Sequence, residues 1–435
     1  MIRRILVVIL LTGMAGAYAQ ENTVSPYSFY ALGDVKFKGT IENRSMAGLS
    51  VYTDSIHLNL TNPAAYGGLK LTTYTAALSY NHVSLKSDNN REGAYTVSFD
   101  YLGLGFPVSK RMGVGIGLMP YTAVGYRLET VDDSQPPAVT TRYSGEGGLN
   151  RLYFSLGYAI TKELSIGLTG NYNFGKLQNE SLSIIEDVQL ATRERNRSHV
   201  NGMDFNFALH YNKYLGDNGL SLRLLLLYDP EAHISSENFR TISTVAISSS
   251  GIETTQDSED IDLNALNLRN TEVTLPYSAA FEAGLGKSKK WFAGIGYKFQ
   301  NTSKFSNPFT DGGNFAYENA YRISVGGFFI PKHDSFTNYW NRVVYRAGIR
   351  YEKTGLRVND TPVNDFGMSF GVGLPLGGYV PNTNTLAFAG LFSNINVGFD
   401  IGKRGTTDLG IQENYFNLNI SFSLNDKWFV KRKYN

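Results

Sequence analysis

Hydrophobic and polar residues alternate strictly over much of this chain. Phe416, Leu418, Ile420, Phe422 and Leu424 fall on one face of a segment whose other face carries only Asn and Ser. A period of two is that of a β-strand, whose successive side chains point to opposite faces. Other segments have polar faces that mix Gly, Asn, Ser and charged residues, as a barrel lumen does. The pattern therefore predicts strands with lipid on one face and a polar lumen on the other.

About fourteen such segments are long enough for a tilted transmembrane strand of ~9–11 residues. They lie near residues 71–86, 93–107, 110–130, 149–161, 162–180, 199–215, 218–232, 273–287, 290–303, 316–331, 341–356, 362–376, 387–402 and 411–425. Tight turns alternate with long polar loops predicted near 131–148, 181–198 and 233–272, as at the two ends of a barrel. The sequence predicts an all-β fold, a membrane-spanning antiparallel barrel of about 14 strands.

The N-terminus has the layout of a secretory signal peptide. Arg3 and Arg4 precede an apolar run, 5–11, and Ala17-Tyr18-Ala19 ends the segment with small residues. We expect cleavage after Ala19, so that residues 1–19 are the signal peptide of a protein exported to the outer membrane. No cysteine follows the cleavage site, which excludes a lipoprotein anchor.

Composition agrees with a barrel and excludes one class of partner. Aromatic residues make up 13% of the chain, charged residues only 18%, and glycine occurs 45 times, as expected for a barrel with aromatic girdles. The net charge is +2 with no basic block in the body of the chain, which argues against binding nucleic acid.

Residues 20–70 do not alternate and contain helix-compatible stretches. We expect them to form a small N-terminal hatch inside the lumen, because they are too few for the large plug domain of energised transporters. The predicted domains are then the hatch at 20–70, the transmembrane barrel at 71–429, and a basic periplasmic tail at 430–435.

A short motif in the hatch segment carries a family resemblance. Met46-Ala47-Gly48 and Asp54-Ser55 precede the stretch 59–67, which contains Asn62, Pro63 and Ala64. This arrangement resembles the segment before the first strand of FadL-type long-chain fatty-acid transporters, a superfamily that includes PorV-like proteins of the type IX secretion system. The stretch 425–433 is similar to the ending of barrels from Bacteroidota. The resemblance implies a fourteen-stranded barrel closed inside by a hatch, with Asn62-Pro63-Ala64 as hatch motif; a purely structural turn is the alternative.

Pro120 lies inside the third predicted strand. Proline has no N–H to donate to the ladder and sits at edges or bulges of sheets. The resemblance to FadL-type barrels, whose third strand is kinked, makes Pro120 a candidate lateral portal in the wall. The alternative is a position near the outer rim, where strand pairing is ending.

Four charged residues, Lys298, Arg346, Arg350 and Asp400, are predicted to face inward from their strands. They either pair with one another or with the hatch, or the two arginines hold the anionic head group of a ligand.

No catalytic or metal-binding motif stands out. The six histidines have no metal-ligand spacing, cysteine is absent, and no Gly-x-Ser-x-Gly sequence occurs. Asp257, Glu259, Asp260 and Asp262 lack the glycine and terminal glutamate of an EF-hand loop. We expect no enzyme activity, no cofactor and no metal.

The sequence favours an outer-membrane barrel that binds or passes fatty-acid-like hydrophobic molecules and releases them laterally. The alternative is a non-enzymatic accessory subunit of a protein-secretion or barrel-assembly machine, as in PorV-like proteins. Expected partners are outer-membrane lipids and either a hydrophobic small molecule or protein subunits. Oily lumen residues beside the hatch would favour the transporter.

Overall fold

The computed structural model describes residues 23–86, 91–134, 136–310, 315–335, 337–376, 393–407, 411–426 and 428. The predicted signal peptide and basic tail lie outside the described residues. Within the described ranges, no helix combines the length and apolar character needed to cross a bilayer.

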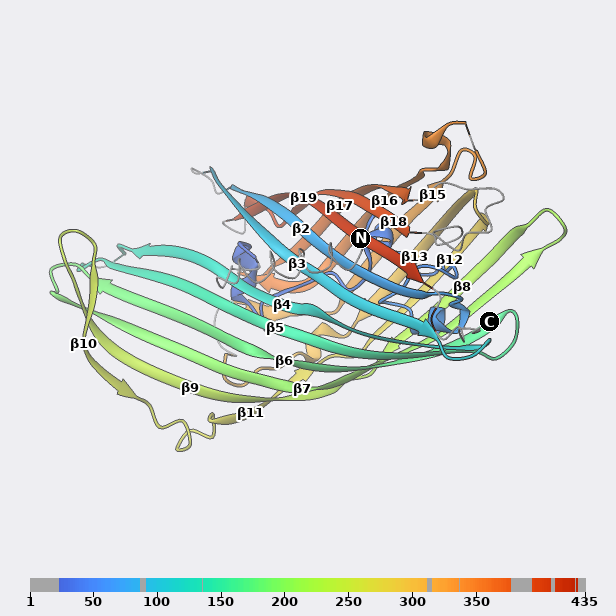
Figure 1. The fold of residues 1–435 in the computed structure, drawn as a ribbon. Helices are drawn as coiled ribbons and strands as arrows, with labels where there is room; N and C mark the ends of the chain where they lie inside the picture. Colours follow the sequence, from blue (N-terminus) through green and yellow to red (C-terminus); the bar gives the residue numbers. More distant parts are fainter. Residues whose placement is uncertain are drawn as a thin grey trace, which may run out of the picture.

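Fourteen antiparallel strands close into a barrel (Figure 1). The last strand pairs with the first, from Asp426 beside Thr72 to Gln412 beside Lys86, and this pairing closes the sheet. The barrel strands are β2 (Thr72–Lys86), β3 (Arg91–Pro107), β4 (Met112–Asp132), β5 (Val139–Ala159), β6 (Leu164–Ile185), β7 (Leu190–Leu215), β8 (Leu220–Asp229), β12 (Ser278–Lys287), β13 (Trp291–Gln300), β15 (Ala320–Phe329), β16 (Val344–Val358), β17 (Thr361–Leu376), β18 (Ser393–Arg404) and β19 (Gln412–Asp426).

Four further strands extend this framework. β9 (Ala232–Ile247) follows β8 along β7 after a break at Pro230, and β11 (Asn270–Leu275) precedes β12 across a break at Pro276. β10 (Glu253–Asp260) pairs with β9, and β14 (Phe315–Tyr317) with β16. Each of the fourteen predicted segments overlaps one barrel strand, so the predicted fold is confirmed, although several strands extend beyond the predicted bounds.

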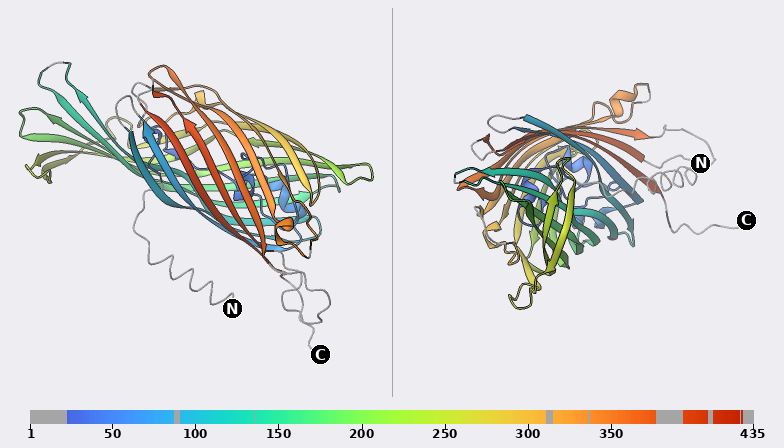
Figure 2. Two further views of the ribbon diagram at one scale, coloured as in Figure 1. Left: turned by 90° about the horizontal axis from the view of Figure 1, so that it is seen from above. Right: turned by 90° about the vertical axis from the view of Figure 1, so that its left-hand side faces the viewer.

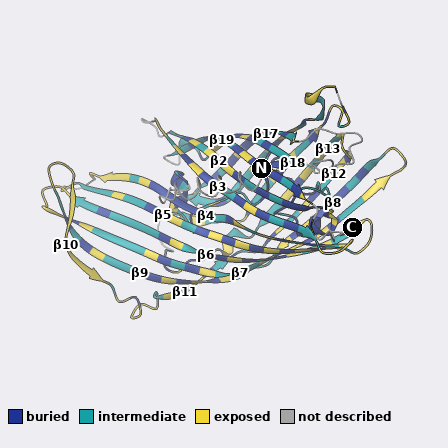
Figure 3. Ribbon diagram, in the orientation of Figure 1, coloured by how far each residue is buried: buried dark blue, intermediate teal, exposed yellow. Residues whose placement is uncertain are grey.

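The predicted alternation is visible in the burial of successive residues (Figure 3). On β19, Phe416, Ile420 and Phe422 are exposed on the outside, whereas Asn419 and Ser421 are buried inside. The outer faces of the neighbouring strands are apolar in the same way. In a bilayer, every backbone polar group must be paired and the lipid-facing surface must be apolar. A closed sheet with an apolar outer band meets both requirements, and the molecule is therefore a barrel of the outer-membrane type.

The prediction of long loops at 131–148, 181–198 and 233–272 is wrong. β4 to β7 continue through most of the first two ranges, and β9, β10 and β11 occupy the third. These extensions form a curved sheet that projects beyond one side of the barrel (Figure 2). We call it the projecting sheet.

The alternation inverts where the projecting sheet begins. On β6, Phe174 faces outward within the membrane band, but further along the strand Leu177 is buried and Gln178 lies on the outer side. Outside the bilayer the outer face meets water, so apolar side chains gather on the inner face instead. That inner cluster contains Leu32, Val124, Tyr126, Leu149, Leu177, Val200, Ile234, Val273 and Leu275. A prediction based on apolar outer faces therefore ends each of these strands at the edge of the membrane band, before the strand itself ends.

Residues 23–70 run inside the barrel (Figure 1). They form η1 (Pro26–Phe29), β1 (Asp34–Val35), α2 (Ile41–Arg44) and η2 (Pro63–Gly68). η1 lies against β4, α2 against β17, β18 and β19, and η2 chiefly against β5 and β6. The segment therefore contacts the inner wall of the barrel at two separate groups of strands, β4–β6 and β17–β19.

η2 packs against the wall at two glycines, Gly157 of β5 and Gly167 of β6. The side chain of Asn62 accepts a hydrogen bond from the backbone N–H of Ala64 at 3.0 Å and so caps η2. A Cβ atom on Gly157 would lie 2.5 Å from the backbone nitrogen of Gly67, and one on Gly167 would lie 2.2 Å from that of Ala64. Glycine at both wall positions allows the Asn62–Ala64 turn to lie directly on the strands.

Asp54 and His57 stabilise the turn before η2. The Asp54 carboxylate accepts hydrogen bonds from the backbone N–H groups of Ile56 and His57, both at 2.9 Å, and lies 2.6 Å from His57 Nδ1. Burial disfavours the charged forms of both side chains, but the attraction between the Asp54 carboxylate and the His57 imidazolium outweighs this effect. The pKa of Asp54 is lowered to about 2 and that of His57 is raised above 6.5.

We predict that Gly167→Ala lowers the free energy of unfolding by about 1–3 kcal/mol, because the new methyl group overlaps the η2 backbone. Gly170→Ala on the same strand is the matched control, since its Cβ would meet only the Phe205 ring at 3.6 Å, and we expect a change below about 0.5 kcal/mol. Urea unfolding in phospholipid vesicles measures both. Equal stability of the two variants would contradict the packing described here.

The Asp54–His57 pair predicts a pH dependence with a defined sign. Because the pKa of His57 is raised, the stabilisation is complete below pH 6.5 and is lost as pH rises through the raised value. Because the pKa of Asp54 is lowered, it is also lost as pH falls from 3.8 through about 2. In NMR of histidine-labelled protein, with His57→Gln for assignment, Asp54→Asn should bring the pKa of His57 below 6.5. An unchanged value would show that the pair is not formed.

Candidate functional site

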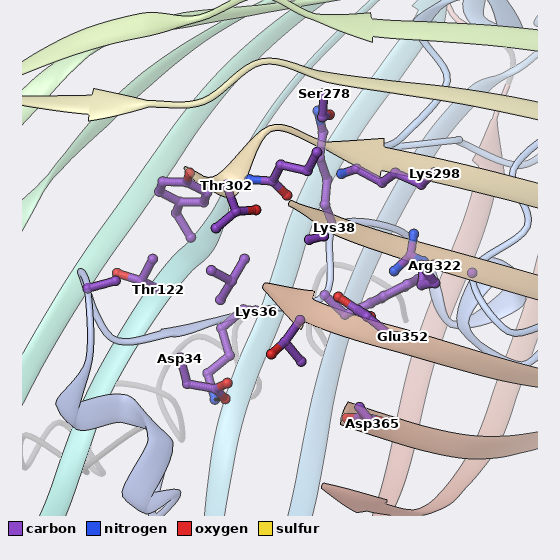
Figure 4. A pocket seen from close by; sticks show the side chains of 18 of the residues that line it. Asp34, Lys36, Lys38, Thr122, Ser278, Lys298, Thr302, Arg322, Glu352 and Asp365 are labelled. Atoms are coloured by element: carbon purple, nitrogen blue, oxygen red, sulfur yellow. Dashed lines mark ion pairs between the residues drawn. The ribbon is translucent and has the colours of Figure 1, made fainter. Parts of the chain in front are cut away.

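A cavity of about 530 Å³ lies between the N-terminal segment and the barrel wall. We call it the lumen cavity. Side chains of both charges point into it, among them Asp34, Lys36, Lys298 and Glu352 (Figure 4). Phe37, Leu49 and other apolar residues complete the lining. The cavity is therefore amphipathic, and not the oily chamber that a pure hydrocarbon ligand would require.

Ion pairs hold the N-terminal segment on the β17–β19 side of the cavity. Arg44 donates from Nε to the buried Asp400 carboxylate at 2.5 Å. Arg404 donates to Asp34 at 2.8 Å and to Asp365 at 3.3 Å. These pairs are largely withdrawn from water, so removing one partner would leave an uncompensated charge in the lumen.

A single carboxylate fixes the segment on the opposite side. Glu282 of β12 accepts hydrogen bonds from the backbone N–H groups of Ser50 and Val51, both at 2.7 Å, and from the Ser50 hydroxyl at 3.1 Å. The strand thereby satisfies two backbone donors that no secondary structure pairs. His210 Nε2 lies 3.0 Å from the Val51 carbonyl oxygen and extends this attachment.

A polar network lines the wall between β5 and β7. Arg151 donates to Asp204 at 2.6 Å, and Asn171 and Asn173 donate to the same carboxylate, also at 2.6 Å. The guanidinium carbon of Arg151 lies 4.0 Å from the centroid of the Tyr121 ring. Each charge in this network has several partners, as buried ionic groups require.

The four charged residues singled out in the sequence lie in different surroundings. Lys298 lines the lumen cavity, and Asp400 binds Arg44 of the N-terminal segment. Arg350 donates to the Tyr415 hydroxyl at 2.7 Å and lies 3.7 Å from Asp365. Arg346 donates to Asn396 at 3.1 Å. The two arginines have separate partners, and the structure does not bring them together around one anion.

The wall changes at Pro120. Pairing between β3 and β4 ends at Leu102 and Leu118, and the β4–β5 ladder has a bulge between Pro120 and Thr122. Beyond that point β3 pairs with β2, from Arg91 to Phe99, and has no ladder to β4 in the described range. We call this interruption the β3–β4 opening.

The N-terminal segment crosses the β3–β4 opening. β1 pairs with the edge of β4, with Asp34 beside Ala123 and Val35 beside Thr122, and the Lys36 N–H donates to the Tyr121 carbonyl at 2.9 Å. Phe99 on β3 and Pro120 on β4 both line the lumen cavity. The cavity thus reaches the wall where the ladder is interrupted.

Several lining residues escaped the sequence analysis. Glu282, Arg322 and Glu352 each follow or precede an outward apolar residue, so the alternation that identified Lys298 also indicates their inward direction. Lys38 and Arg44 carry no such signal because their segment does not alternate. Within the described ranges, no group of three or more His, Asp or Glu residues is placed to hold a metal ion.

Comparisons with known structures return the same architecture. A FadL homologue of Pseudomonas aeruginosa is 12% identical, with a TM-score of 0.55 over 91% of this chain and 100% of that one. The toluene transporter TbuX of Ralstonia pickettii is 12% identical, with a TM-score of 0.56 over 89% and 99%. The toluene transporter TodX of P. putida is 13% identical, with a TM-score of 0.55 over 91% and 100%. At such identities the similarity establishes the fold alone.

No curated protein sequence matches the chain. The relationship to PorV-like proteins and to Bacteroidota stays a prediction. A sequence model of one family, BamG, matches residues 1–435, and a match over the whole length shows that the chain belongs to the BamG family.

Proposed function

We propose that this barrel is a non-enzymatic outer-membrane protein that holds an amphiphilic small molecule in the lumen cavity and exchanges it sideways with the bilayer. The observation that carries the proposal is the extent of the cavity, which runs from a charged centre to Phe99 and Pro120 at the β3–β4 opening. An amphiphile matches both ends, with its head group among the charges and its chain toward the wall.

The charged centre narrows the class of ligand. A hydrocarbon there would separate Lys298 and Glu352 from water without offering them a hydrogen bond, which is costly for any ionised group. A polar head group replaces water as the partner. Lateral exchange is favoured for the chain, because each CH₂ moved from lipid into a wet lumen loses ~0.8 kcal/mol.

The N-terminal segment is assigned the role of a hatch. Its attachments to Asp400 on one side and Glu282 on the other favour a fixed plug that blocks a straight path through the lumen. β1 is held to β4 through two paired residues, and its Asp34 also accepts a hydrogen bond from Arg404. In this proposal β1 is the part of the hatch that yields when a ligand passes the opening.

Pro120→Val is predicted to slow the uptake of a fluorescent fatty acid by cells at least about tenfold, because valine restores the missing N–H and lets the ladder close. Pro107→Val, at the far end of β3 where β3 and β4 are still paired, is the matched control and should take up the probe at the wild-type rate. Both variants should be folded, as judged by heat-modifiable migration. Wild-type uptake by folded Pro120→Val would remove the portal from the mechanism.

The second candidate function is that of an accessory subunit in a protein-secretion or barrel-assembly machine. The observation that favours it is the tip of the projecting sheet, where Val131, Val188, Leu190 and Ile252 have exposed fractions of 60%, 51%, 44% and 65%. Val131 and Leu190 lie on strand extensions of the projecting sheet, and Val188 and Ile252 lie in the connections between such strands. Large apolar side chains grouped on a water-facing surface are typical of protein interfaces.

For this candidate, we predict that Val188→Asp combined with Leu190→Asp abolishes a complex that survives purification of the wild-type protein in mild detergent, because two charges would have to be buried in the interface. Ile323→Ala, on the outer face of β15 far from the tip, is the control and should retain the complex. Native mass spectrometry identifies the subunits. A complex that survives the double substitution would place the interface elsewhere, and a wild-type barrel recovered alone would contradict the subunit role.

A further inference from the structure

Three cations in the lumen cavity differ from the other lumen charges. Arg44, Arg151 and Arg404 each form an ion pair. The side chains of Lys38, Lys298 and Arg322 point into the cavity (Figure 4). Among the described residues, no carboxylate oxygen lies within 4 Å of their charged nitrogens. We call them the cation group.

The strand register explains how two members of the cation group are placed. Lys298 of β13 is the direct cross-strand partner of Arg322 on β15, and Arg322 is in turn the partner of Glu352 on β16. Directly opposed side chains in an antiparallel pair have their Cβ atoms about 4.5–5.5 Å apart. Two cations and one carboxylate therefore stand side by side at one level of the wall, facing the cavity.

Asp229 of β8 attracts Lys38 and Lys298 from more than 4 Å away, but Lys298 still lies directly beside Arg322, so the row remains unfavourable unless something compensates it. Like charges on directly opposed positions destabilise a sheet, and Lys298 beside Arg322 is such a pair. Glu352 forms no ion pair at 4 Å or less within the described part of the chain. An anion among the three cations would relieve their repulsion, and a cation beside Glu352 would neutralise its charge.

A further polar feature lies on the neighbouring strands β7, β8 and β12. Asn206 is buried, its amide nitrogen donates to Asp229 at 2.6 Å, and its carbonyl oxygen has no hydrogen-bond partner. Ser278 donates to the same Asp229 at 2.6 Å. A buried acceptor without a donor is costly, so Asn206 adds a place for an N–H or O–H group of a ligand.

We propose that the cation group and Glu352 bind a zwitterionic phosphate–ammonium head group of the phosphoethanolamine type, on a single-chain amphiphile. The phosphate lies among Lys38, Lys298 and Arg322, with Arg322 able to bind two of its oxygens. The ammonium group lies beside Glu352. The inference rests on the proposed amphiphile-holding function and names its ligand class.

The charge pattern separates this head group from a fatty-acid carboxylate. A carboxylate offers the cations the same single negative charge as a phosphodiester, but it gives Glu352 no cationic partner. A phosphate monoanion or diester serves the cations, but without an ammonium group it would be repelled by Glu352. Only a head group with both signs matches the row of opposed residues on β13, β15 and β16. The apolar lining, including Phe37 and Phe99, takes the chain toward the β3–β4 opening.

The test uses the full-length barrel in detergent, with affinities for three single-chain amphiphiles measured by native mass spectrometry. Lysophosphatidylethanolamine should bind at least about tenfold more tightly than lysophosphatidylglycerol or oleate, as expected for one additional charge-assisted contact. Glu352→Gln should remove this preference while leaving lysophosphatidylglycerol unaffected or improved. Lys298→Met should weaken both lysophospholipids about tenfold. Lys353→Met, which removes a neighbouring lysine paired with Glu318 at 3.0 Å, is the charge-matched control and should change neither.

The outcomes are distinguishable. Equal binding of all three amphiphiles, or a preference that survives Glu352→Gln, overturns the head-group assignment and leaves the proposed function standing. Absence of binding by every amphiphile overturns the proposed function as well. Glycerophosphoethanolamine, which lacks the chain, should compete only weakly. Competition equal to that of the lysophospholipid would show that a soluble phosphoester is the ligand. Arg322→Gln replaces Lys298→Met if the latter fails to fold.

Discussion

The structure depends on one constraint: a backbone N–H or C=O group in hydrocarbon must be paired, at a cost of several kcal/mol when it is not. The pairing of β19 with β2 satisfies it around the closed wall. The same constraint makes the β3–β4 opening the most informative part of the wall, because the β3 edge from Arg91 to Phe99 leaves β4 while its outer side chains are still apolar. β1 covers only a short part of the β4 edge. Whatever completes the opening has to contribute polar groups or exclude lipid.

The lumen follows the opposite rule. It is largely polar, and charges and hydrogen bonds hold the N-terminal segment there alongside apolar clusters such as that of Met46, Leu49 and Val51 with the wall. Glu282 receives two backbone N–H groups, and Asp400 receives Arg44. Glycines at Gly157 and Gly167 let the η2 backbone approach the wall closely. The charges that remain after these attachments, Lys298 and Arg322 above all, are those that the N-terminal segment does not use. Residual charge of this kind is a better guide to a ligand than the charge of the lumen as a whole.

The membrane part of the fold could be predicted from sequence because lipid imposes one rule on every strand. Alternation alone was sufficient to locate all fourteen strands and the outward direction of Phe416 and Ile420. The projecting sheet was missed because the rule inverts there, with Leu177 turned inward and polar residues outside. At the site, the inward direction of Lys298 follows from its place in the strand. Its pairing with Arg322 depends on register across a long connection, which alternation does not determine. The position of Lys38 depends on the N-terminal segment, whose sequence has no periodicity.

The bulge between Pro120 and Thr122 links these features. One extra residue in a strand exchanges its two faces. Before the bulge Ile116 and Leu118 face the lipid; after it Val124 and Tyr126, which without the bulge would also point outward, belong to the inner cluster of the projecting sheet. The irregularity that ends pairing with β3 is therefore also the start of the projecting sheet. Both candidate functions depend on this bulge, the transporter through the β3–β4 opening and the subunit through the projecting sheet. A change at Pro120 therefore acts on the wall and on the projecting sheet together, whereas a change at the tip acts on the sheet alone.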